Sequence, residues 1–237
     1  MKAWKLRIKI GGKLSTPLHG DTIFGHVAWG IARREGEESI SEFLALFSHE
    51  PALVVSSAFP AGQVPAPMLS PSSSMLRDSG QYELLKKVKK IKYIPVSTIL
   101  SGKPVSRVSF PIQDLHYEEY RQSSLHNTVD RFGAGTLEET GLYERTEYWP
   151  VHIGSTDRRE PASMDIYLLS TLSKERLATV FSWAFESGYG ARASTGSGQV
   201  SIEGLEEFSP PRTGSRAVAL GPFVLSPGNQ LGNLDRK

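Results

Sequence analysis

Residues 188–198 read Gly-Tyr-Gly-Ala-Arg-Ala-Ser-Thr-Gly-Ser-Gly, a glycine-rich run that separates a predicted helix from a predicted strand. Before this run, residues 164–170 are apolar enough for a strand, and Ser173 is a suitable N-cap for a helix that ends near residue 186. After it, residues 199–205 alternate apolar and polar side chains, which is the period of a half-buried strand. The sequence therefore predicts strand, helix, glycine-rich loop and strand in this order.

The residue types of this loop suit an RNA backbone. Glycine lets backbone amides approach a phosphate closely, Arg192 supplies positive charge, hydroxyl groups supply donors, and Tyr189 offers a stacking face. The loop is not a Walker loop, because no Gly-Lys-Ser/Thr follows, and not a Rossmann fingerprint, because it follows a helix. A purely structural loop is the alternative. The candidate RNA-binding residues here are Gly188, Tyr189, Gly190, Arg192, Ser194, Thr195, Gly196 and Gly198.

The N-terminal part of the chain has a similar order of elements. Residues 4–10 alternate apolar and basic side chains, as a half-buried strand does. Asp21 is the expected N-cap of a helix that ends near residue 34, a second helix is expected at residues 41–48, and residues 53–58 predict a strand. Prolines then hold residues 59–67 extended.

The middle and the end of the chain are less regular. Residues 81–92 predict a helix with lysines on its outer side. Residues 113–148 are polar and turn-rich, so we expect an excursion from the body that is partly a β-hairpin. A last strand is expected at residues 217–225, followed by a polar end that frays.

Charge is distributed unevenly, although the net charge of the 237 residues is only +2. From Arg77 to Arg107 there are eight basic and two acidic residues, whereas from Asp114 to Glu160 there are ten acids and five arginines. We therefore expect a basic surface that can meet phosphate and an acidic surface that can meet a protein neighbour. For the lysine run alone, a solvated helix face is the alternative.

Composition excludes several classes of protein. With 39% hydrophobic and 22% charged residues, an ordered globular protein is expected. The absence of cysteine removes disulfides, thiolate nucleophiles and cysteine-based zinc sites. No stretch approaches the roughly 20 apolar residues of a membrane helix. We therefore expect a cytoplasmic protein with no membrane contact.

Four segments carry a resemblance to a known family. The glycine-rich loop is similar to the signature loop of the repeat-associated (RAMP) CRISPR proteins. Residues 18–26 (Leu-His-Gly-Asp-Thr-Ile-Phe-Gly-His), 56–67 and 126–131 (His-Asn-Thr-Val-Asp-Arg) resemble segments of subunit four of the type III-A CRISPR Csm effector complex. Because the four segments occur in the same order as in that subunit, the match is specific.

The resemblance implies an α+β fold. It consists of two ferredoxin-like (RRM-like) βαββαβ-type halves, an inserted thumb or β-hairpin region, and the C-terminal glycine-rich loop. The expected boundaries are residues 1–110 for the N-terminal half, 111–150 for the thumb and 151–237 for the C-terminal half. Members of the family continue past residues 223–227 into a further strand, so we expect the second half to be shortened or completed by a partner.

The resemblance also implies a non-catalytic subunit of an antiviral ribonucleoprotein complex that binds the repeat-derived 5′ tag of the guide RNA (crRNA). The implied partners are the guide RNA, a large polymerase-like signalling subunit and an adjacent RAMP backbone subunit, with no cofactor and no metal. Asn127 and Arg131 can read a base edge and grip a phosphate, and Phe132 can stack. The further candidate RNA-binding residues are His19, Gly20, Asp21, Thr22, His126, Asn127, Arg131 and Phe132.

Other interpretations stay open. His19 or His26 can act as the general base of a metal-independent guide-RNA-processing endoribonuclease of the same superfamily. The scattered carboxylates can suggest a two-metal nuclease, although no pair has a recognisable ligand spacing. A scaffold that docks proteins and never touches RNA is a third possibility. Cores or subunit contacts are the expected places of Trp29, Trp149 and Trp183.

Overall fold

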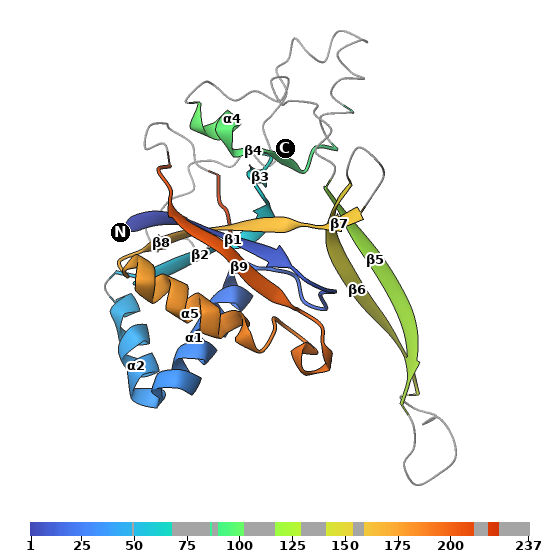
Figure 1. Cartoon of the computed structure of the whole chain (residues 1–237), viewed down its shortest axis with the longest axis horizontal. Coiled ribbons are helices and arrows are strands. Elements are labelled where there is room, and N and C mark those ends of the chain that lie inside the picture. Colours follow the sequence, from blue (N-terminus) through green and yellow to red (C-terminus); the bar gives the residue numbers. More distant parts are fainter. Residues whose placement is uncertain are drawn as a thin grey trace, which may run out of the picture.

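The computed structural model describes residues 1–48, 50–67, 86, 90–101, 117–128, 141–153, 159–210 and 218–222. Its main body is a four-stranded antiparallel sheet in the order β2–β8–β1–β9 (Figure 1). The strands are β1 Lys2–Ile10, β2 Leu53–Pro60, β8 Ser163–Ser170 and β9 Val200–Glu207. The four strands expected at these places are therefore confirmed, with ends that differ by one or two residues.

Strand β1 is an inner strand of the sheet, with a partner strand along each edge, and its apolar side chains lie on one face. Leu6 lies opposite Ile166 of β8 and opposite Leu205 of β9. Leu6 and Ile8 are completely buried in the main core, as the period of two predicts. Burial of a side chain of this size contributes about 1.5–3 kcal/mol to folding.

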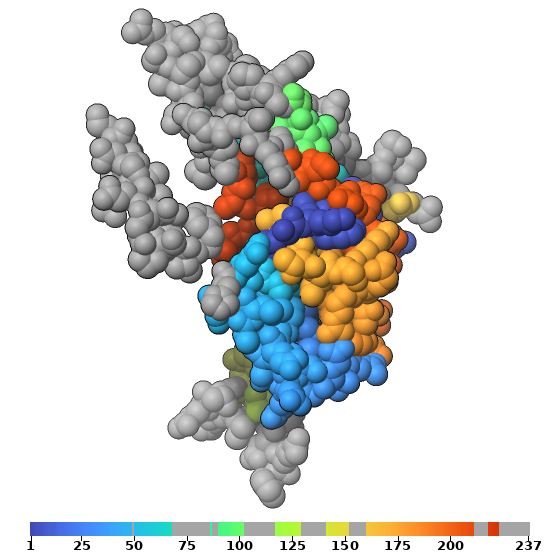
Figure 2. Space-filling view, turned by 90° about the vertical axis from the view of Figure 1, so that its left-hand side faces the viewer, coloured from blue at the N-terminus to red at the C-terminus, as the bar shows by residue number. Residues whose placement is uncertain are grey.

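Helices cover one face of this sheet. Helix α1 Gly20–Glu35 packs against α5 Lys174–Glu186, and α2 Glu37–Ala45 lies beside α1 (Figures 1 and 2). Helix α5 begins as predicted, since the Arg176 N–H donates to Ser173 Oγ at 3.2 Å. Helix α2 begins at Glu37, earlier than the expected residue 41, and continues into a short turn, η1 Leu46–Ser48.

The start of α1 differs from the prediction. The expected N-cap Asp21 lies in the first turn, where its Oδ1 accepts from the Thr22 N–H at 2.8 Å, and His19 holds the cap position. The cause is close packing against β2. A Cβ on Gly20 would lie 2.5 Å from the Val55 carbonyl oxygen, so the helix can begin there only with glycine.

These elements form one βαββαβ unit with the strand order of the ferredoxin-like fold. Its first half comes from residues 2–60 and its second half from residues 163–207. We expected one ferredoxin-like unit in each half of the chain. Among the described residues the strands of both halves instead join a single sheet, because β1 has β8 and β9 as its neighbours. The boundaries at residues 110 and 150 stay a prediction.

A long β-hairpin is inserted between β2 and β8. Strand β5 Tyr117–Asn127 pairs antiparallel with β6 Leu142–Ile153, and β7 Arg159–Pro161 adds a short third strand. The predicted hairpin is therefore present. It is tied to the main body at Leu14 and Tyr148, whose N–H groups donate to each other's carbonyl oxygens at 2.8 and 3.0 Å.

The second face of the sheet is covered at one end by β3 Gln63–Pro65, β4 Tyr93–Pro95 and α4 Val96–Leu100 (Figure 1). A small second core lies there, formed by Phe59, Val64, Ile94 and Tyr167. A last strand was expected at residues 217–225. The described part of this segment, residues 218–222, contains no strand.

Asp165 of β8 is completely buried on this second face. Arg7 of β1 donates to it through Nε at 2.8 Å and through Nη2 at 3.0 Å, and the Gly62 N–H donates at 2.7 Å. The ion pair thus joins β1, β8 and the turn after β2.

Part of the predicted helix at residues 81–92 lies outside the described residues, which include only Lys86 and residues 90–92 of it. None of the helices in the described part of the chain is both long enough and apolar enough to cross a bilayer.

Candidate nucleic-acid interface

The glycine-rich loop follows α5 and has a backbone that most residues avoid. Its four glycines, Gly188, Gly190, Gly196 and Gly198, have φ angles between 71° and 86°. Arg192 has φ 65° and is the one described non-glycine residue with a positive φ. The left-handed conformation is unfavourable for a side chain of this kind, and such strain is typical of functional loops.

Tyr189 holds the loop on the main body. Its ring is completely buried, its hydroxyl donates to the Pro17 carbonyl at 2.7 Å, and its N–H donates to the Gly198 carbonyl at 2.7 Å. A Cβ on Gly198 would lie 1.9 Å from the Tyr189 carbonyl oxygen. The stacking face predicted for Tyr189 is therefore covered by protein, and burial raises the pKa of its hydroxyl.

His26 of α1 supports the same loop from below. Its Nε2 accepts from the Gly190 N–H at 3.0 Å, and its ring lies 4.8 Å from the ring of Tyr189. A backbone hydrogen bond with Ala184 engages the ring as well. Burial lowers the pKa of His26, and an acceptor at Nε2 requires the neutral imidazole.

Residues 13–17, which we call the connector, join the loop to the hairpin. The Gly198 N–H donates to the Lys13 carbonyl at 2.7 Å, and the Ala191 N–H donates to Thr16 Oγ1 at 2.9 Å. From the hairpin, the Tyr148 hydroxyl donates to the Thr16 carbonyl at 2.6 Å. No local sequence pattern predicts these contacts, because the residues that they join lie far apart in the chain.

Three cations gather around one carboxylate where the connector, loop and hairpin meet. Lys13 Nζ lies 2.7 Å from Glu147 Oε2, and Arg145 also pairs with Glu147. Lys13, then Arg145 and Arg192, hold the pKa of Glu147 below its usual range. We call Lys13, Arg145, Arg192 and Glu147 the basic cluster. Its cations outnumber its carboxylate, so it can accept an anionic ligand.

The outer side of the loop faces solvent. Arg192, Ser194 and Thr195 are exposed, and the Thr195 hydroxyl donates to the Arg192 carbonyl at 3.0 Å. The cation and the hydroxyl groups predicted for this loop are therefore exposed. Tyr189 and Gly198, in contrast, are buried and support the loop from inside.

The candidates at the start of α1 divide in the same way. His19 and Asp21 are exposed and Thr22 is half-buried, whereas Gly20 is buried against β2. Thr22 and the loop come together, although 166 positions separate Thr22 from Gly188, because both line one pocket.

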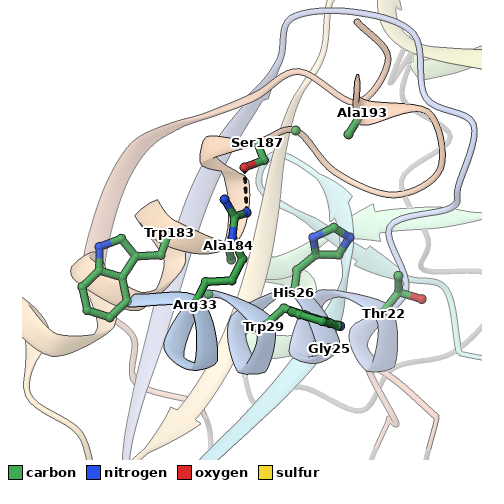
Figure 3. A pocket seen from close by; sticks show the side chains of 11 residues that line it. Thr22, Gly25, His26, Trp29, Arg33, Trp183, Ala184, Ser187 and Ala193 are labelled. Carbon is green, nitrogen blue, oxygen red and sulfur yellow. Dashed lines mark hydrogen bonds between the residues drawn. The ribbon is translucent and has the colours of Figure 1, made fainter. Parts of the chain in front are cut away.

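This pocket, of about 430 Å³, lies between α1, the end of α5 and the glycine-rich loop (Figure 3). Along α1 it is lined by Thr22, Gly25, Trp29 and Arg33. The opposite side has Ser187 and Ala193 (Figure 3). The RNA-binding candidates predicted from the sequence did not include Gly25, Trp29 or Arg33, although their spacing of four residues places them on one helix face. Trp29 is 70% exposed, so it does not belong to a core.

The candidates on the hairpin lie elsewhere. His126 receives or gives a hydrogen bond with Ser124 Oγ at 2.9 Å, and its ring stacks on that of Tyr143 at 5.6 Å. Asn127, next to it, is exposed. The end of β5 that carries them lies apart from the glycine-rich loop (Figure 1). Arg131 and Phe132 lie outside the described residues.

No group of three or more histidine and acidic side chains is placed to hold a metal ion in the part of the chain that the structure describes.

Comparison with known proteins gives structural neighbours alone. No protein-family model and no curated protein sequence matches the chain. The chain is similar to a chain of the Csm1-Csm4 cassette in complex with AMPPNP, at 18% identity and a TM-score of 0.57, covering 91% of this chain and 74% of that one. It is also similar to one of the Csm1-Csm4 cassette in complex with pppApA, at 17% identity and a TM-score of 0.56, covering 91% and 73%. These likenesses show the fold, and the predicted resemblance to subunit four of the Csm complex agrees with them.

Proposed function

We propose that the chain is a non-catalytic subunit of a type III CRISPR ribonucleoprotein, that it binds the repeat-derived 5′ tag of the guide RNA, and that it docks a large signalling subunit. The observation that carries the proposal is the glycine-rich loop. The connector and Tyr189 fix its path, so that Arg192, Ser194 and Thr195 face solvent. The fold shared with chains of Csm1-Csm4 cassettes supports the same function.

The charge around the loop favours a phosphate backbone. The basic cluster adds Lys13 and Arg145 to Arg192, with Glu147 as its one carboxylate. Contacts to phosphates position RNA without reading its sequence, and each neutralised phosphate of a single strand adds about 0.7 to the salt dependence of binding. We therefore expect binding that weakens steeply as salt is added.

The lack of catalysis is part of the proposal and is supported by the state of His26. A general base for RNA cleavage needs a free nitrogen to take the proton of a 2′-hydroxyl. The Nε2 atom of His26 already accepts a hydrogen bond from the Gly190 N–H, and the ring forms a further hydrogen bond with the Ala184 backbone. His19, exposed at the cap of α1, is then the candidate base for the endoribonuclease alternative.

We further propose that the hairpin faces protein partners, the large subunit and an adjacent RAMP backbone subunit. Glu118 and Glu144 are exposed on its two strands, and the apolar side chains of Leu125 and Leu142 are 70% and 68% exposed near its end. Exposed apolar side chains with a polar rim are typical of a surface that a partner covers.

The RNA-binding proposal is tested by titrating the full chain into labelled single-stranded RNA that begins with the tag and into RNA with a scrambled tag. We expect both RNAs to bind, because phosphate contacts do not read the sequence, and we expect a salt slope that falls by about 0.7 in Arg192→Ala. Lys2→Ala is the control, because Lys2 is an exposed cation on β1 outside the basic cluster. Equal salt slopes in the wild type and Arg192→Ala would favour the docking-only scaffold.

The same mixtures test catalysis. We expect the RNA to remain intact without added metal. Cleavage that disappears in His19→Ala would replace this proposal with the endoribonuclease.

A further inference from the structure

The pocket beside the glycine-rich loop is lined by a large aromatic side chain, Trp29, that is not packed in a core. Trp29 is 70% exposed, whereas Trp183, also in the lining, is half-buried and has the Arg176 guanidinium 5.5 Å from its ring centre. Figure 3 shows the Trp29 side chain lying along α1 toward Gly25. A large aromatic ring that is open at the edge of a hollow is a common contact for a ligand.

Gly25 is the second observation. A Cβ at Gly25 would meet nothing within 4 Å, whereas one at Gly30 would lie 3.0 Å from Trp183 Cβ and one at Gly20 would strike the backbone of β2. Glycine inside a helix is less favourable than alanine, and no contact with the described residues requires a glycine at position 25. Its effect is to leave space in front of Trp29, whose side chain leans toward the N-terminus of α1.

The polar groups of the pocket indicate the charge of its ligand. Arg33 Nη1 donates to Ser187 Oγ at 3.0 Å, which directs the guanidinium across the pocket (Figure 3). The described residues that line the pocket include no carboxylate. A flat aromatic face beside a cation fits a base and its phosphate, the two repeating parts of a single RNA strand.

The pocket is also continuous with the proposed RNA-binding surface. Gly188 and Ala193, which line the pocket, belong to the glycine-rich loop, and Ala193 directly follows Arg192. An RNA backbone on the outer side of the loop can therefore direct a base into the pocket. A volume of about 430 Å³ lies within the range of about 300–1,000 Å³ typical of small-ligand pockets.

We propose that Trp29 is a stacking platform for one unpaired base of the bound RNA, with Gly25 leaving the space for that base and Arg33 meeting the adjoining phosphate. This inference rests on the proposed RNA-binding function. Trp29 contributes to RNA affinity by stacking on a base, whereas Arg192 contributes through its charge. We therefore expect Trp29→Ala to leave the salt slope of binding unchanged and Arg192→Ala to lower it.

The test uses the full chain, a single-stranded tag RNA, and a series of the same RNA in which one base at a time is removed. We expect Trp29→Ala to lower the affinity between about 5-fold and 150-fold with an unchanged salt slope. At one position, removing the base should weaken wild-type binding by a similar factor and have no effect on Trp29→Ala. The matched control is Leu44→Ala, which removes another exposed apolar side chain of the helical layer.

Gly25→Leu gives a second and independent variant. Its Cβ would meet no described atom within 4 Å and its side chain would extend into the pocket, so we expect an unchanged or higher melting temperature together with a loss of affinity like that of Trp29→Ala.

Three outcomes would overturn the inference. If wild-type protein binds the tag RNA and Trp29→Ala binds it equally well, the stacking site is wrong while the proposed function stands. If Trp29→Ala keeps its RNA affinity but no longer copurifies with the large subunit, the pocket belongs to a protein interface. If wild-type protein binds no RNA, the inference and the proposed function fall together.

Discussion

At the scale of single residues, the glycines of the glycine-rich loop differ in whether they pack against the rest of the protein. Gly198 and Gly196 have nearly the same backbone, with φ 71° and 86°, but different surroundings. A Cβ on Gly198 would overlap the Tyr189 carbonyl, whereas one on Gly196 would meet nothing within 4 Å. The first glycine is therefore needed for packing and the second for its backbone conformation alone.

This difference gives a prediction with an internal control. Gly196→Ala should lower the free energy of unfolding by about 1 kcal/mol, the usual penalty of a left-handed alanine. Gly198→Ala should lower it by at least about 3 kcal/mol, because the loop must also move away from Tyr189. Urea unfolding of both variants measures the two values, and equal losses would show that the contact between residues 189 and 198 is absent.

Residue type alone did not decide which side chains of this loop face solvent. Arg192, Ser194 and Thr195 were selected by residue type and are exposed. Tyr189 was selected in the same way and is buried, because its pocket is built by Pro17 and His26, more than 160 positions away. No local pattern contains that information.

At the scale of elements, α1, the loop and the hairpin are joined through shared atoms. Gly190 of the loop donates to His26 of α1, and Thr16 of the connector accepts from both the loop and the hairpin. A change in any one of these elements is therefore expected to reach the exposed side of the loop.

His26 makes this link dependent on pH. In the unfolded chain it takes up a proton near pH 6.5, whereas in the folded protein its pKa is lower. Its stabilising contribution is therefore complete above about pH 6.5, is lost as the pH falls below that value, and stops changing below the folded pKa. We expect the melting temperature to fall less between pH 7.5 and pH 5.5 in His26→Gln than in the wild type. An equal fall in both proteins would contradict a neutral His26 in the fold.

Periodicity explains which elements could be predicted. Strand β1 and helix α5 have regular apolar spacing, strands β2 and β8 begin or continue as short apolar runs, and each was expected near its observed place. The start of α1 was wrong because Asp21 is a good cap in isolation, while the backbone of β2 requires Gly20 in the first turn. That requirement belongs to packing between elements.

At the scale of the whole molecule, one sheet takes strands from two distant parts of the chain. The pairing of β1 with β8 and β9 could not be read from the sequence, because strand partners are set by tertiary contacts. The ion pair of Arg7 with Asp165 lies at this junction, and the Gly62 N–H completes it.

The ion pair gives a prediction for global stability. Arg7→Ala should lower the free energy of unfolding by about 3 kcal/mol, because it leaves the carboxylate of Asp165 buried without its cation. Lys9→Ala, a change on the same strand at an exposed site, should alter it by less than about 0.5 kcal/mol. In the double variant Arg7→Ala/Asp165→Ala part of the loss should be recovered, and full additivity of the two losses would argue against the pair.

The insertion of the hairpin between β2 and β8 has a consequence for synthesis. Strand β1 emerges first from the ribosome, but both of its neighbours lie beyond residue 162. At roughly 5–20 residues per second, β1 waits about 8–30 s for its first partner. During that time its apolar face and both backbone edges are open to other chains. Nascent chains halted before β8 should therefore be the most dependent on chaperones and the most prone to aggregate.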